Sequence, residues 1–392
     1  MKFKTVAILG STGSIGKTTL KIINKTKKFK VILIIANSNY PKILSQIKNF
    51  KPRIAVINNF EVYLKIKKIS KFKKTIILNK VTDIKKYLKE VDITVSAIPG
   101  ISGLEPTLTF VKLSKKVLLA NKESIVCGWR LIKKNAIKYK TDLVPIDSEH
   151  FSISELTKNK SNDEIKKIYI TASGGPFLNL DKSKFKNIKP KNAIKHPKWK
   201  MGKKISVDSA TLMNKVLELT EAVKLFPFDL DKYEIVIHPQ SLVHAIVEFK
   251  NGTTNFLYHL PDMKIPISNA LFESKLDFNK YFKDKNSNNF SNQKLEFFPP
   301  DEKKFSTLKL IPKMNLAESA PIIINAANEI FVDEFLKNNI RFNDIFAYLK
   351  LVLKDRSYIK TSKMLSNSVK NIYKIDSWSR NLAHKIIKKN NN

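Results

Sequence analysis

Residues 6–16 read Val-Ala-Ile-Leu-Gly-Ser-Thr-Gly-Ser-Ile-Gly, a short apolar run followed at once by Gly10, Gly13 and Gly16. A helical pattern with Leu20 and Ile23 on its apolar side comes directly afterwards. A glycine loop between a strand and a helix lets the backbone approach a pyrophosphate, which then lies at the helix N-terminus. The spacing differs from the common GxGxxG form, so an ordinary strand–helix turn stays open as an alternative. The stretch predicts the start of a dinucleotide-binding domain.

Apolar runs of strand length continue along the first 146 residues and alternate with lysine-rich amphipathic segments; they cover residues 31–35, 54–57, 75–78, 93–96, 117–119 and 143–146. Continuous apolar strands alternating with helices are typical of a parallel sheet covered on both faces. We therefore expect an α/β protein with an N-terminal Rossmann-like, doubly wound parallel sheet. The predicted dinucleotide-binding domain spans residues 1–146.

The pattern changes after residue 146. Four further strands are expected at residues 168–171, 235–237, 245–249 and 255–258, and they indicate a second sheet with helices packed on it. We predict a central α+β catalytic domain, a linker rich in Lys, Asn and Asp, and a C-terminal helical domain. The catalytic domain is expected at residues 147–278, with a closing lid at about 186–204. The linker is expected at residues 279–308 and the helical domain at residues 309–392.

The composition is strongly basic, with a net charge of +38 over 392 residues. Only five of the 72 basic residues are arginine, the residue that supplies much of phosphate and base recognition. Lysine, asparagine and isoleucine share AT-rich codons, so genome composition explains this pattern; loose polyanion binding stays open as the alternative. We expect no specific nucleic-acid partner.

Cys127 is the single cysteine, which excludes an intrachain disulfide and favours a reducing compartment. The N-terminus shows no signal-peptide pattern, and no apolar stretch has the length of a membrane span. These features predict a cytoplasmic protein with no membrane partner.

The end of the second apolar run indicates which dinucleotide is used. Folds that prefer NAD usually place a carboxylate there, on the ribose 2′-hydroxyl. Here the run ends Ala36-Asn37-Ser38-Asn39, without a carboxylate. Ser38, Asn39 and the nearby Lys42 could instead donate to a 2′-phosphate, so the sequence favours NADP.

Asp147 and Glu149 follow the run 143–146 directly. If the backbone stays extended, residues two apart face the same side. Two carboxylates so close repel each other unless one is protonated or a cation lies between them, and oxygen ligands suit Mg²⁺ or Mn²⁺. Ligands of open α/β sheets bind at the carboxyl ends of strands. The sequence therefore indicates a metal site, with a solvated acidic loop as the alternative.

The segment 209–226 has the pattern of one amphipathic helix, with Leu212, Val216, Leu219 and Val223 on its apolar face. A second face carries Asn214, Lys215 and Glu218. These three could supply a third metal ligand beside phosphate donors, or they could be the solvated side of the helix.

Two further segments suggest an anion-binding turn and a lid that closes over it. Ser173-Gly-Gly-Pro176 follows the run 168–171, and glycine-rich turns after strands present N–H groups and a hydroxyl to anions. The segment 186–204 is polar, broken by prolines, and carries His196 and Trp199, as a closing lid would. A tight turn and a surface loop with one packed tryptophan are the respective alternatives.

Motifs in the same order along nearly the whole chain closely resemble the 1-deoxy-D-xylulose 5-phosphate reductoisomerase family of the non-mevalonate isoprenoid pathway. The matching stretches are residues 10–16, 119–124, 145–150, 172–177, 196–202, 204–211, 213–215, 238–241, 261–263 and 325–329.

The resemblance implies a site residue by residue. The divalent metal (Mn²⁺, Mg²⁺ or Co²⁺) would be bound by Asp147, Glu149 and Glu218, and these three with Lys122 and His196 would be catalytic. Substrate contacts would come from Lys122, Ser148, Ser173, His196, Trp199, Ser209, Asn214, Lys215 and Glu218. NADPH would be bound by Thr12, Gly13, Ser14, Ile15, Asn37, Ser38, Asn39, Asn121, Glu123 and Gly202. The family's homodimer implies a second copy as partner.

The implied reaction rearranges 1-deoxy-D-xylulose 5-phosphate, a sugar phosphate, and reduces the product to 2-C-methyl-D-erythritol 4-phosphate. Val216 stands where the family usually has glycine, and Asn37-Ser38 and Leu271-Phe-Glu273 also depart from its common pattern. One competing hypothesis is another NADP-dependent dehydrogenase that acts on a semialdehyde; it would need its own nucleophile or base, and Cys127 lacks a persuasive setting for that role. The other is a lysine-rich protein that binds nucleic acid or a membrane surface.

Overall fold

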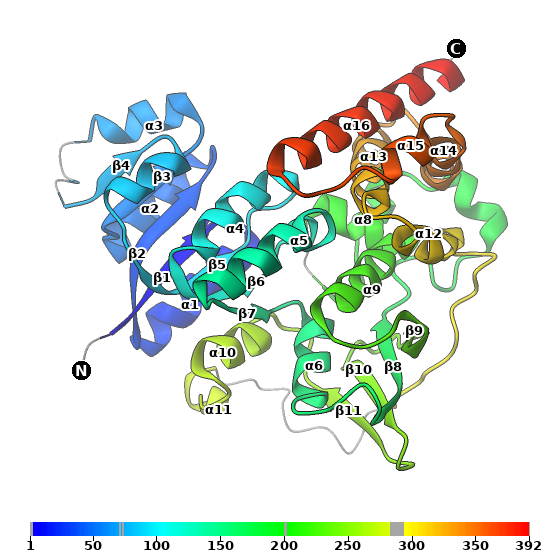
Figure 1. Cartoon of the computed structure of the whole chain (residues 1–392), viewed down its shortest axis with the longest axis horizontal. Coiled ribbons are helices and arrows are strands. Elements are labelled where there is room, and N and C mark those ends of the chain that lie inside the picture. Colours follow the sequence, from blue (N-terminus) through cyan, green and yellow to red (C-terminus); the bar gives the residue numbers. More distant parts are fainter. Residues whose placement is uncertain (1–2, 70–71, 73, 200–201, 283–293, 392) are drawn as a thin grey trace. The chain divides into compact units, whose positions relative to one another are not determined.

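The computed structural model describes residues 3–69, 72, 74–199, 202–282 and 294–391, and its elements are labelled in Figure 1. The chain divides into two compact units. The first contains residues 1–124, 131–151 and 263–288, and the second contains residues 125–130, 152–262 and 289–392.

The first unit contains a seven-stranded sheet in which every neighbouring pair is parallel. Its order is β4-β3-β2-β1-β5-β6-β7. The strands are β1 Lys4–Leu9, β2 Phe29–Ala36, β3 Ile54–Ile57, β4 Ile76–Leu78, β5 Val91–Ser96, β6 Ser114–Leu119 and β7 Asp142–Pro145. The connecting helices include α1 Ser14–Thr26, α2 Tyr40–Phe50, α3 Phe60–Lys67, α4 Leu104–Val111 and α5 Lys122–Tyr139. The predicted doubly wound parallel sheet is confirmed.

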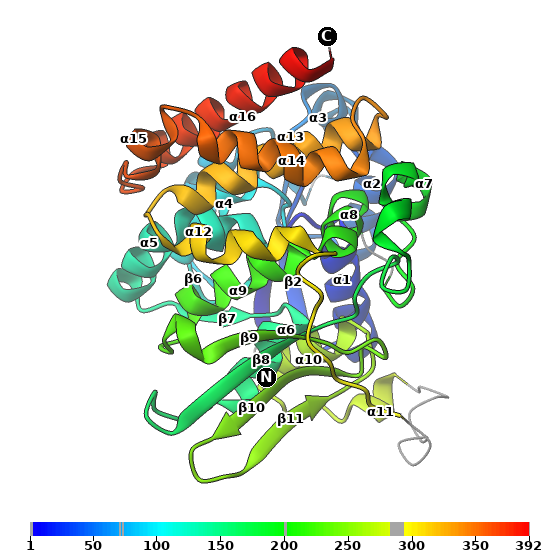
Figure 2. The ribbon, with the colours of Figure 1, turned by 90° about the vertical axis from the view of Figure 1, so that its right-hand side faces the viewer.

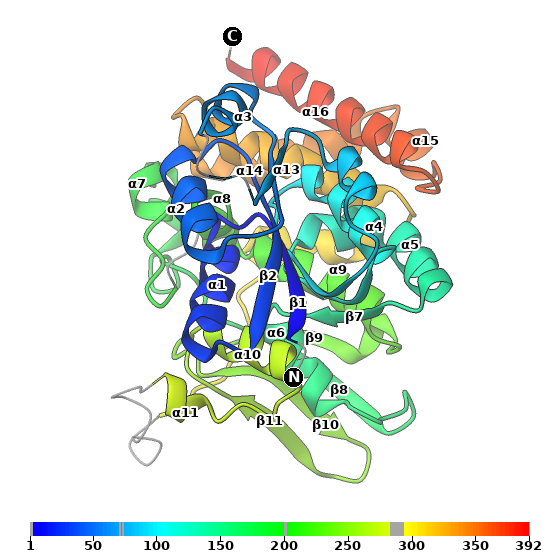
Figure 3. The same ribbon diagram turned by 90° about the vertical axis from the view of Figure 1, so that its left-hand side faces the viewer.

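Both faces of this sheet are buried, which explains why its strands contain continuous apolar runs such as residues 6–9. Val6 and Ile8 belong to one core cluster, whereas Ala7 and Leu9 belong to a second cluster on the other face. Helix α10 (Lys264–Phe272) packs beside α1 and adds Ile267 to the first cluster (Figure 3).

The strand order reverses at β1, whose neighbours are β2 on one side and β5 on the other. In open α/β sheets, ligands bind beyond the carboxyl ends of the strands at such a switch point. The glycine loop of residues 10–16 starts there.

The second unit contains a four-stranded sheet in the order β11-β10-β8-β9. The strands are β8 Ile165–Ala172, β9 Tyr233–Ile237, β10 Val243–Phe249 and β11 Thr254–Tyr258. Strand β10 runs antiparallel to both of its neighbours, and β8 and β9 are parallel. Helix α9 (Met213–Leu225) packs on this sheet through Leu219 and Ala222.

The C-terminal part of the second unit is helical, as predicted. Its helices are α12 Ile311–Asn315, α13 Ala320–Leu336, α14 Phe342–Lys354, α15 Tyr358–Ser362 and α16 Val369–Asn391. Helix α13, buried along most of its length, packs against both α14 and α16 (Figure 2). No helix in the described part of the chain is long and apolar enough to cross a membrane.

The single helix expected over residues 209–226 is wrong. The chain instead forms α8 (Lys203–Thr211) and α9, with Leu212 between them at φ 60°. A left-handed residue ends an α-helix, and the Leu212 N–H donates to Ser209 O at 3.2 Å. The apolar pattern concealed this break because the Leu212 side chain is buried as well.

The domain boundaries stay a prediction. Of the expected linker, residues 283–293 lie outside the described residues, and so do residues 200–201 of the expected lid. The described parts of these segments include short helical turns at Phe278–Tyr281, Lys182–Asn187 and Pro190–Ala193.

Candidate active site

The glycine loop between β1 and α1 is held against two neighbouring strands. The N–H groups of Gly10 and Ser11 both donate to Ile35 O, at 3.0 and 2.9 Å. Gly10 has φ +83°, and a Cβ there would lie 2.4 Å from Ala97 O. A Cβ on Gly16 would lie 2.4 Å from Gly10 O. These two positions therefore require glycine.

The start of α1 offers backbone N–H groups at this loop. Gly13 is the N-cap residue, and no side chain of the described residues caps the helix there. An uncapped helix N-terminus is a favourable place for a phosphate. Thr12, Ser14 and Ile15, which were predicted to bind NADPH, lie in this loop and the first turn of α1.

Asn37, Ser38 and Asn39 follow β2, the neighbour of β1, and all three are exposed. Asn39 is the N-cap residue of α2, and its side chain accepts the Lys42 N–H at 3.3 Å. Since the carboxyl ends of parallel strands meet at one edge of the sheet, this turn and the glycine loop lie at the same edge.

Asn121 and Glu123 follow β6 at the same edge. The Asn121 amide donates to Glu123 Oε2 at 2.8 Å and to Gly100 O at 3.2 Å, while its Oδ1 accepts the Ser124 N–H at 2.8 Å. Between them, Lys122 donates from Nζ to Asp147 Oδ2 at 2.6 Å. The end of β6 is thereby joined to the end of β7.

Asp147 and Glu149 do not lie on an extended backbone, so that part of the prediction is wrong. Strand β7 ends at Pro145, and α6 (Ser148–Leu156) begins one residue after Asp147. The Glu149 N–H donates to Asp147 Oδ1 at 3.3 Å, and Ser148 Oγ donates to the Glu149 carboxylate. A tight strand–helix turn, instead of strand alternation, brings the two carboxylates together.

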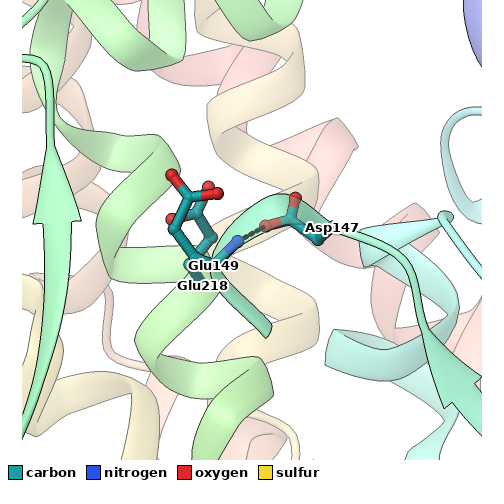
Figure 4. Close-up of side chains that lie close together, drawn as sticks. All are labelled: Asp147, Glu149 and Glu218. Carbon is teal, nitrogen blue, oxygen red and sulfur yellow. Dashed lines mark hydrogen bonds between the residues drawn. The ribbon is translucent and has the colours of Figure 1, made fainter. Parts of the chain in front are cut away.

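Glu218, on α9, completes a cluster of three carboxylates with Asp147 and Glu149 (Figure 4). Each side chain offers one oxygen, and these oxygens lie within 4.8 Å of one another. Glu218 is 1% exposed, and Lys215 Nζ lies 2.5 Å from its Oε2. The Asn214 amide donates to its other oxygen. The three predicted metal ligands thus come together, with an ammonium group beside Asp147 and another beside Glu218.

The Ser173 turn follows β8. Gly174 and Gly175 have φ +80° and +66°, and the Gly175 N–H donates to Ser173 Oγ at 3.2 Å. A Cβ on Gly175 would lie 2.7 Å from Ser209 O, so the turn packs closely against α8 at Ser209. Two of the predicted phosphate-binding serines therefore belong to neighbouring segments.

His196 lies against this turn, with Nε2 2.9 Å from Ser173 Oγ. Its Nδ1 accepts the N–H groups of Trp199 and Lys198, at 2.9 and 3.2 Å. A nitrogen that accepts two hydrogen bonds carries no proton, so Nε2 carries it and donates to Ser173. Burial, helped by the charge of Lys215, lowers the pKa of His196 to about 4.

Three family models match the chain. The 1-deoxy-D-xylulose 5-phosphate reductoisomerase model covers residues 6–128, the model of that enzyme's C-terminal domain covers residues 143–226, and a DXP reductoisomerase C-terminal domain model covers residues 259–382. A 1-deoxy-D-xylulose 5-phosphate reductoisomerase from Pelagibacter ubique is 41% identical over 380 residues, covering 96% of this chain and 97% of its own. The chain belongs to the 1-deoxy-D-xylulose 5-phosphate reductoisomerase family.

Further members of this reductoisomerase family agree in length and fold. The enzyme of that name from Wolbachia pipientis wMel is 40% identical, with 98% of each chain covered. A solved structure of DOX-P reductoisomerase in complex with NADPH, fosmidomycin and magnesium is 34% identical, with a TM-score of 0.90 and 98% of each chain covered. The Zymomonas mobilis reductoisomerase in complex with NADPH has a TM-score of 0.86 at 33% identity, covering 98% of this chain and 99% of its own.

Val216, which replaces the glycine usual in the reductoisomerase family, is fully buried on α9. This burial fits the expectation that it lies on the apolar face of the helix. Gly202, the remaining predicted NADPH contact, is the exposed N-cap residue of α8.

Several residues near the site were not singled out from the sequence. His150, in the stretch that contains Asp147, is buried, with Nδ1 3.9 Å from Asp147 Oδ1. Trp199 packs edge-on against His244 with ring centroids 6.0 Å apart, and His244 stacks on His259 at 3.8 Å. His150 was within reach of motif reasoning, but the ring stack pairs residues on separate elements and leaves no local sequence signal.

Proposed function

We propose that this chain converts 1-deoxy-D-xylulose 5-phosphate to 2-C-methyl-D-erythritol 4-phosphate, using NADPH and a divalent cation. The observation that carries the proposal is the cluster formed by Asp147, Glu149 and Glu218. The names of the relatives and the NADPH and magnesium complexes of solved family members support it.

The three carboxylates suit a hard divalent cation, because they offer oxygen ligands from three side chains. A cation bound there would polarise the ketone of the substrate and lower the pKa of its neighbouring hydroxyl. Without a cation, three carboxylates so close would repel one another, and Lys122 and Lys215 partly compensate their charge. We propose that Lys122 and Ser148 contact the substrate beside the cation.

The substrate phosphate would be held by Ser173, Ser209, Asn214 and Lys215. The Nε2–H of His196 points at Ser173 Oγ and can donate to a phosphate oxygen in that position. Binding energy from the phosphate, which takes no part in the chemistry, can then hold His196 and Trp199 over the reacting carbons.

NADPH would lie along the carboxyl edge of the parallel sheet, with its pyrophosphate at Thr12–Ile15 and its adenosine end at Asn37–Asn39. We propose that Asn121, Glu123 and Gly202 complete its contacts. When bound, NADPH supplies the hydride that reduces the rearranged aldehyde.

The test follows NADPH oxidation with 1-deoxy-D-xylulose 5-phosphate, with and without Mg²⁺ or Mn²⁺. Glu218→Gln should lower the metal-dependent rate and the Mn²⁺ affinity by about 100-fold or more. Glu221→Gln is the matched control, because Glu221 is equally buried on the same helix but lies outside the cluster.

Equal effects of the two substitutions would refute the metal site. A folded wild-type protein that binds NADPH but shows no metal-dependent oxidation would refute the activity. The semialdehyde dehydrogenase alternative gains no support, because Cys127, the single cysteine, is only 2% exposed within α5.

We further propose a cytoplasmic homodimer in which residues 147–278 supply most of the interface, as the family resemblance implies. Light scattering of the eluted protein should give twice the 44.9 kDa chain mass. A mass of one chain at micromolar concentration would refute the dimer.

A further inference from the structure

Ser11, in the glycine loop, and Gln46, on α2, form a closed pair of hydrogen bonds although they lie 35 residues apart. Ser11 Oγ donates to Gln46 Oε1 at 2.7 Å, and Gln46 Nε2 donates to Ser11 O at 2.9 Å. Ser11 is fully buried and Gln46 is 8% exposed. Only this orientation of the amide works, since a rotated amide would place its oxygen against a carbonyl oxygen.

The pair leaves no polar group of Ser11 unsatisfied. Its N–H donates to Ile35 O at 2.9 Å, its carbonyl accepts from Gln46, and its hydroxyl donates to Gln46. The next two residues, Thr12 and Gly13, lead into the uncapped start of α1. The buried side chain of Gln46 therefore holds the loop backbone that would face a pyrophosphate.

Helix α2 links this contact to the other end of the proposed cofactor site. It begins directly after Asn37-Ser38, with Asn39 as its cap, and Gln46 lies two turns further along. A rigid helix thus relates the turn proposed for the adenosine end to the loop proposed for the pyrophosphate.

We propose that Gln46 is a positioning residue for NADPH: it holds the Ser11–Gly13 loop in the conformation that receives the pyrophosphate. This inference rests on the proposed NADPH site. Without the Gln46 amide, the Ser11 carbonyl and hydroxyl lose their buried partner, and the loop samples other conformations. NADPH must then order the loop on binding, which weakens its apparent affinity.

The test compares Gln46→Leu and Ser11→Ala with the wild type. We expect Gln46→Leu to raise the Kd and the KM for NADPH about tenfold, corresponding to the loss of buried hydrogen bonds. Ser11→Ala should have a smaller effect, because the bond from Gln46 Nε2 to the backbone carbonyl remains. The kcat at saturating NADPH and the KM for the sugar phosphate should stay within about twofold.

Ser114→Ala is the matched control. Ser114 shares a buried 2.8 Å hydrogen bond with Thr94 in the same sheet, but it lies at the start of β6, at the opposite edge from the glycine loop. It should lower the melting temperature about as much as Ser11→Ala, without changing the Kd for NADPH.

The outcomes separate this inference from the proposed function. Failure of the wild type to bind NADPH would refute the cofactor assignment itself. Tight binding by the wild type with an unchanged Kd in both variants would refute the positioning role, as would equal losses in kcat and in both KM values. Should Gln46→Leu fail to fold, the Kd values for NADPH of Ser11→Ala and Ser114→Ala still test the positioning role.

Discussion

The lowered pKa of His196 predicts how the stability of the folded chain depends on pH. Its pKa in the folded chain, about 4, lies below the ordinary value of 6.5, chiefly because the ring is buried. Between these values the unfolded chain binds a proton that the folded chain does not, so the free energy of unfolding falls as the pH drops from about 6.5 to 4. His196→Gln should make the melting temperature less sensitive to pH in this window, and an unchanged slope would contradict the assignment.

Substitution of alanine for Gly16 or for Gly13 in the dinucleotide loop should lower stability and NADPH binding to different degrees. In Gly16→Ala the Cβ would meet Gly10 O at 2.4 Å and Ser11 Cα at 2.6 Å, so the backbone must shift. In Gly13→Ala the nearest atom is Gly10 O at 3.3 Å. We expect Gly16→Ala to cost about 1–3 kcal/mol of stability and to abolish NADPH binding, with a milder effect at Gly13. Equal melting temperatures for the two variants would contradict this ranking.

At the residue scale, the sequence predicted the carboxylates but not the geometry that gathers them. Asp147 and Glu149 were chosen because they follow a strand, and they do lie with Glu218. The turn that brings them together depends on where α6 begins, which hydrophobic periodicity does not define. Gln46 could not be found in this way, because its partner Ser11 is distant along the chain.

Among the elements, α8 is tied to the C-terminal helices by a buried carboxylate, Asp208. Asp208 is 1% exposed; it pairs with Lys204 Nζ at 2.9 Å and accepts from Asn328 Nδ2 on α13 at 2.9 Å. Asn328→Leu should destabilise the chain by about 2–3 kcal/mol, since a buried charge loses a hydrogen bond. Ser209 is the next residue of α8, so the KM for the sugar phosphate should also rise.

Urea unfolding would measure the first effect and steady-state kinetics the second. Asn315→Ala is the control, because among the described residues its amide donates only to Ile311 O, within its own helix. We expect it to change stability by less than about 0.5 kcal/mol. A loss of stability at Asn328 no larger than at Asn315 would show that the contact with Asp208 is unimportant.

The strands were easier to predict than the helix ends. Continuous apolar runs located the seven parallel strands because both faces of that sheet are buried. The junction between α8 and α9 was missed because a buried Leu212 fits the apolar pattern both of one continuous helix and of two separate helices. Its left-handed backbone is accompanied by a tertiary contact, the hydrogen bond from Thr307 Oγ1 to Thr211 O, which the local sequence does not encode.

For the whole molecule, the net charge of +38 leaves two explanations, genome composition and polyanion binding. Lysines spread over the surface attract any polyanion, and this attraction weakens steeply as salt screens the charges and as fewer counterions are released. We therefore expect weak binding to DNA that falls by an order of magnitude or more between 50 and 200 mM salt.

This binding should not depend on sequence, because arginine, which reads base edges, is scarce among the 72 basic residues. Two duplexes of equal length and unrelated sequence should give equal Kd values at each salt concentration. NADPH oxidation at physiological salt should be unchanged by either duplex, because the lysines are spread along the whole chain and the binding they support is weak at that salt concentration. A tenfold preference for one duplex, or its inhibition of turnover at physiological salt, would mean that the lysines carry a function beyond composition.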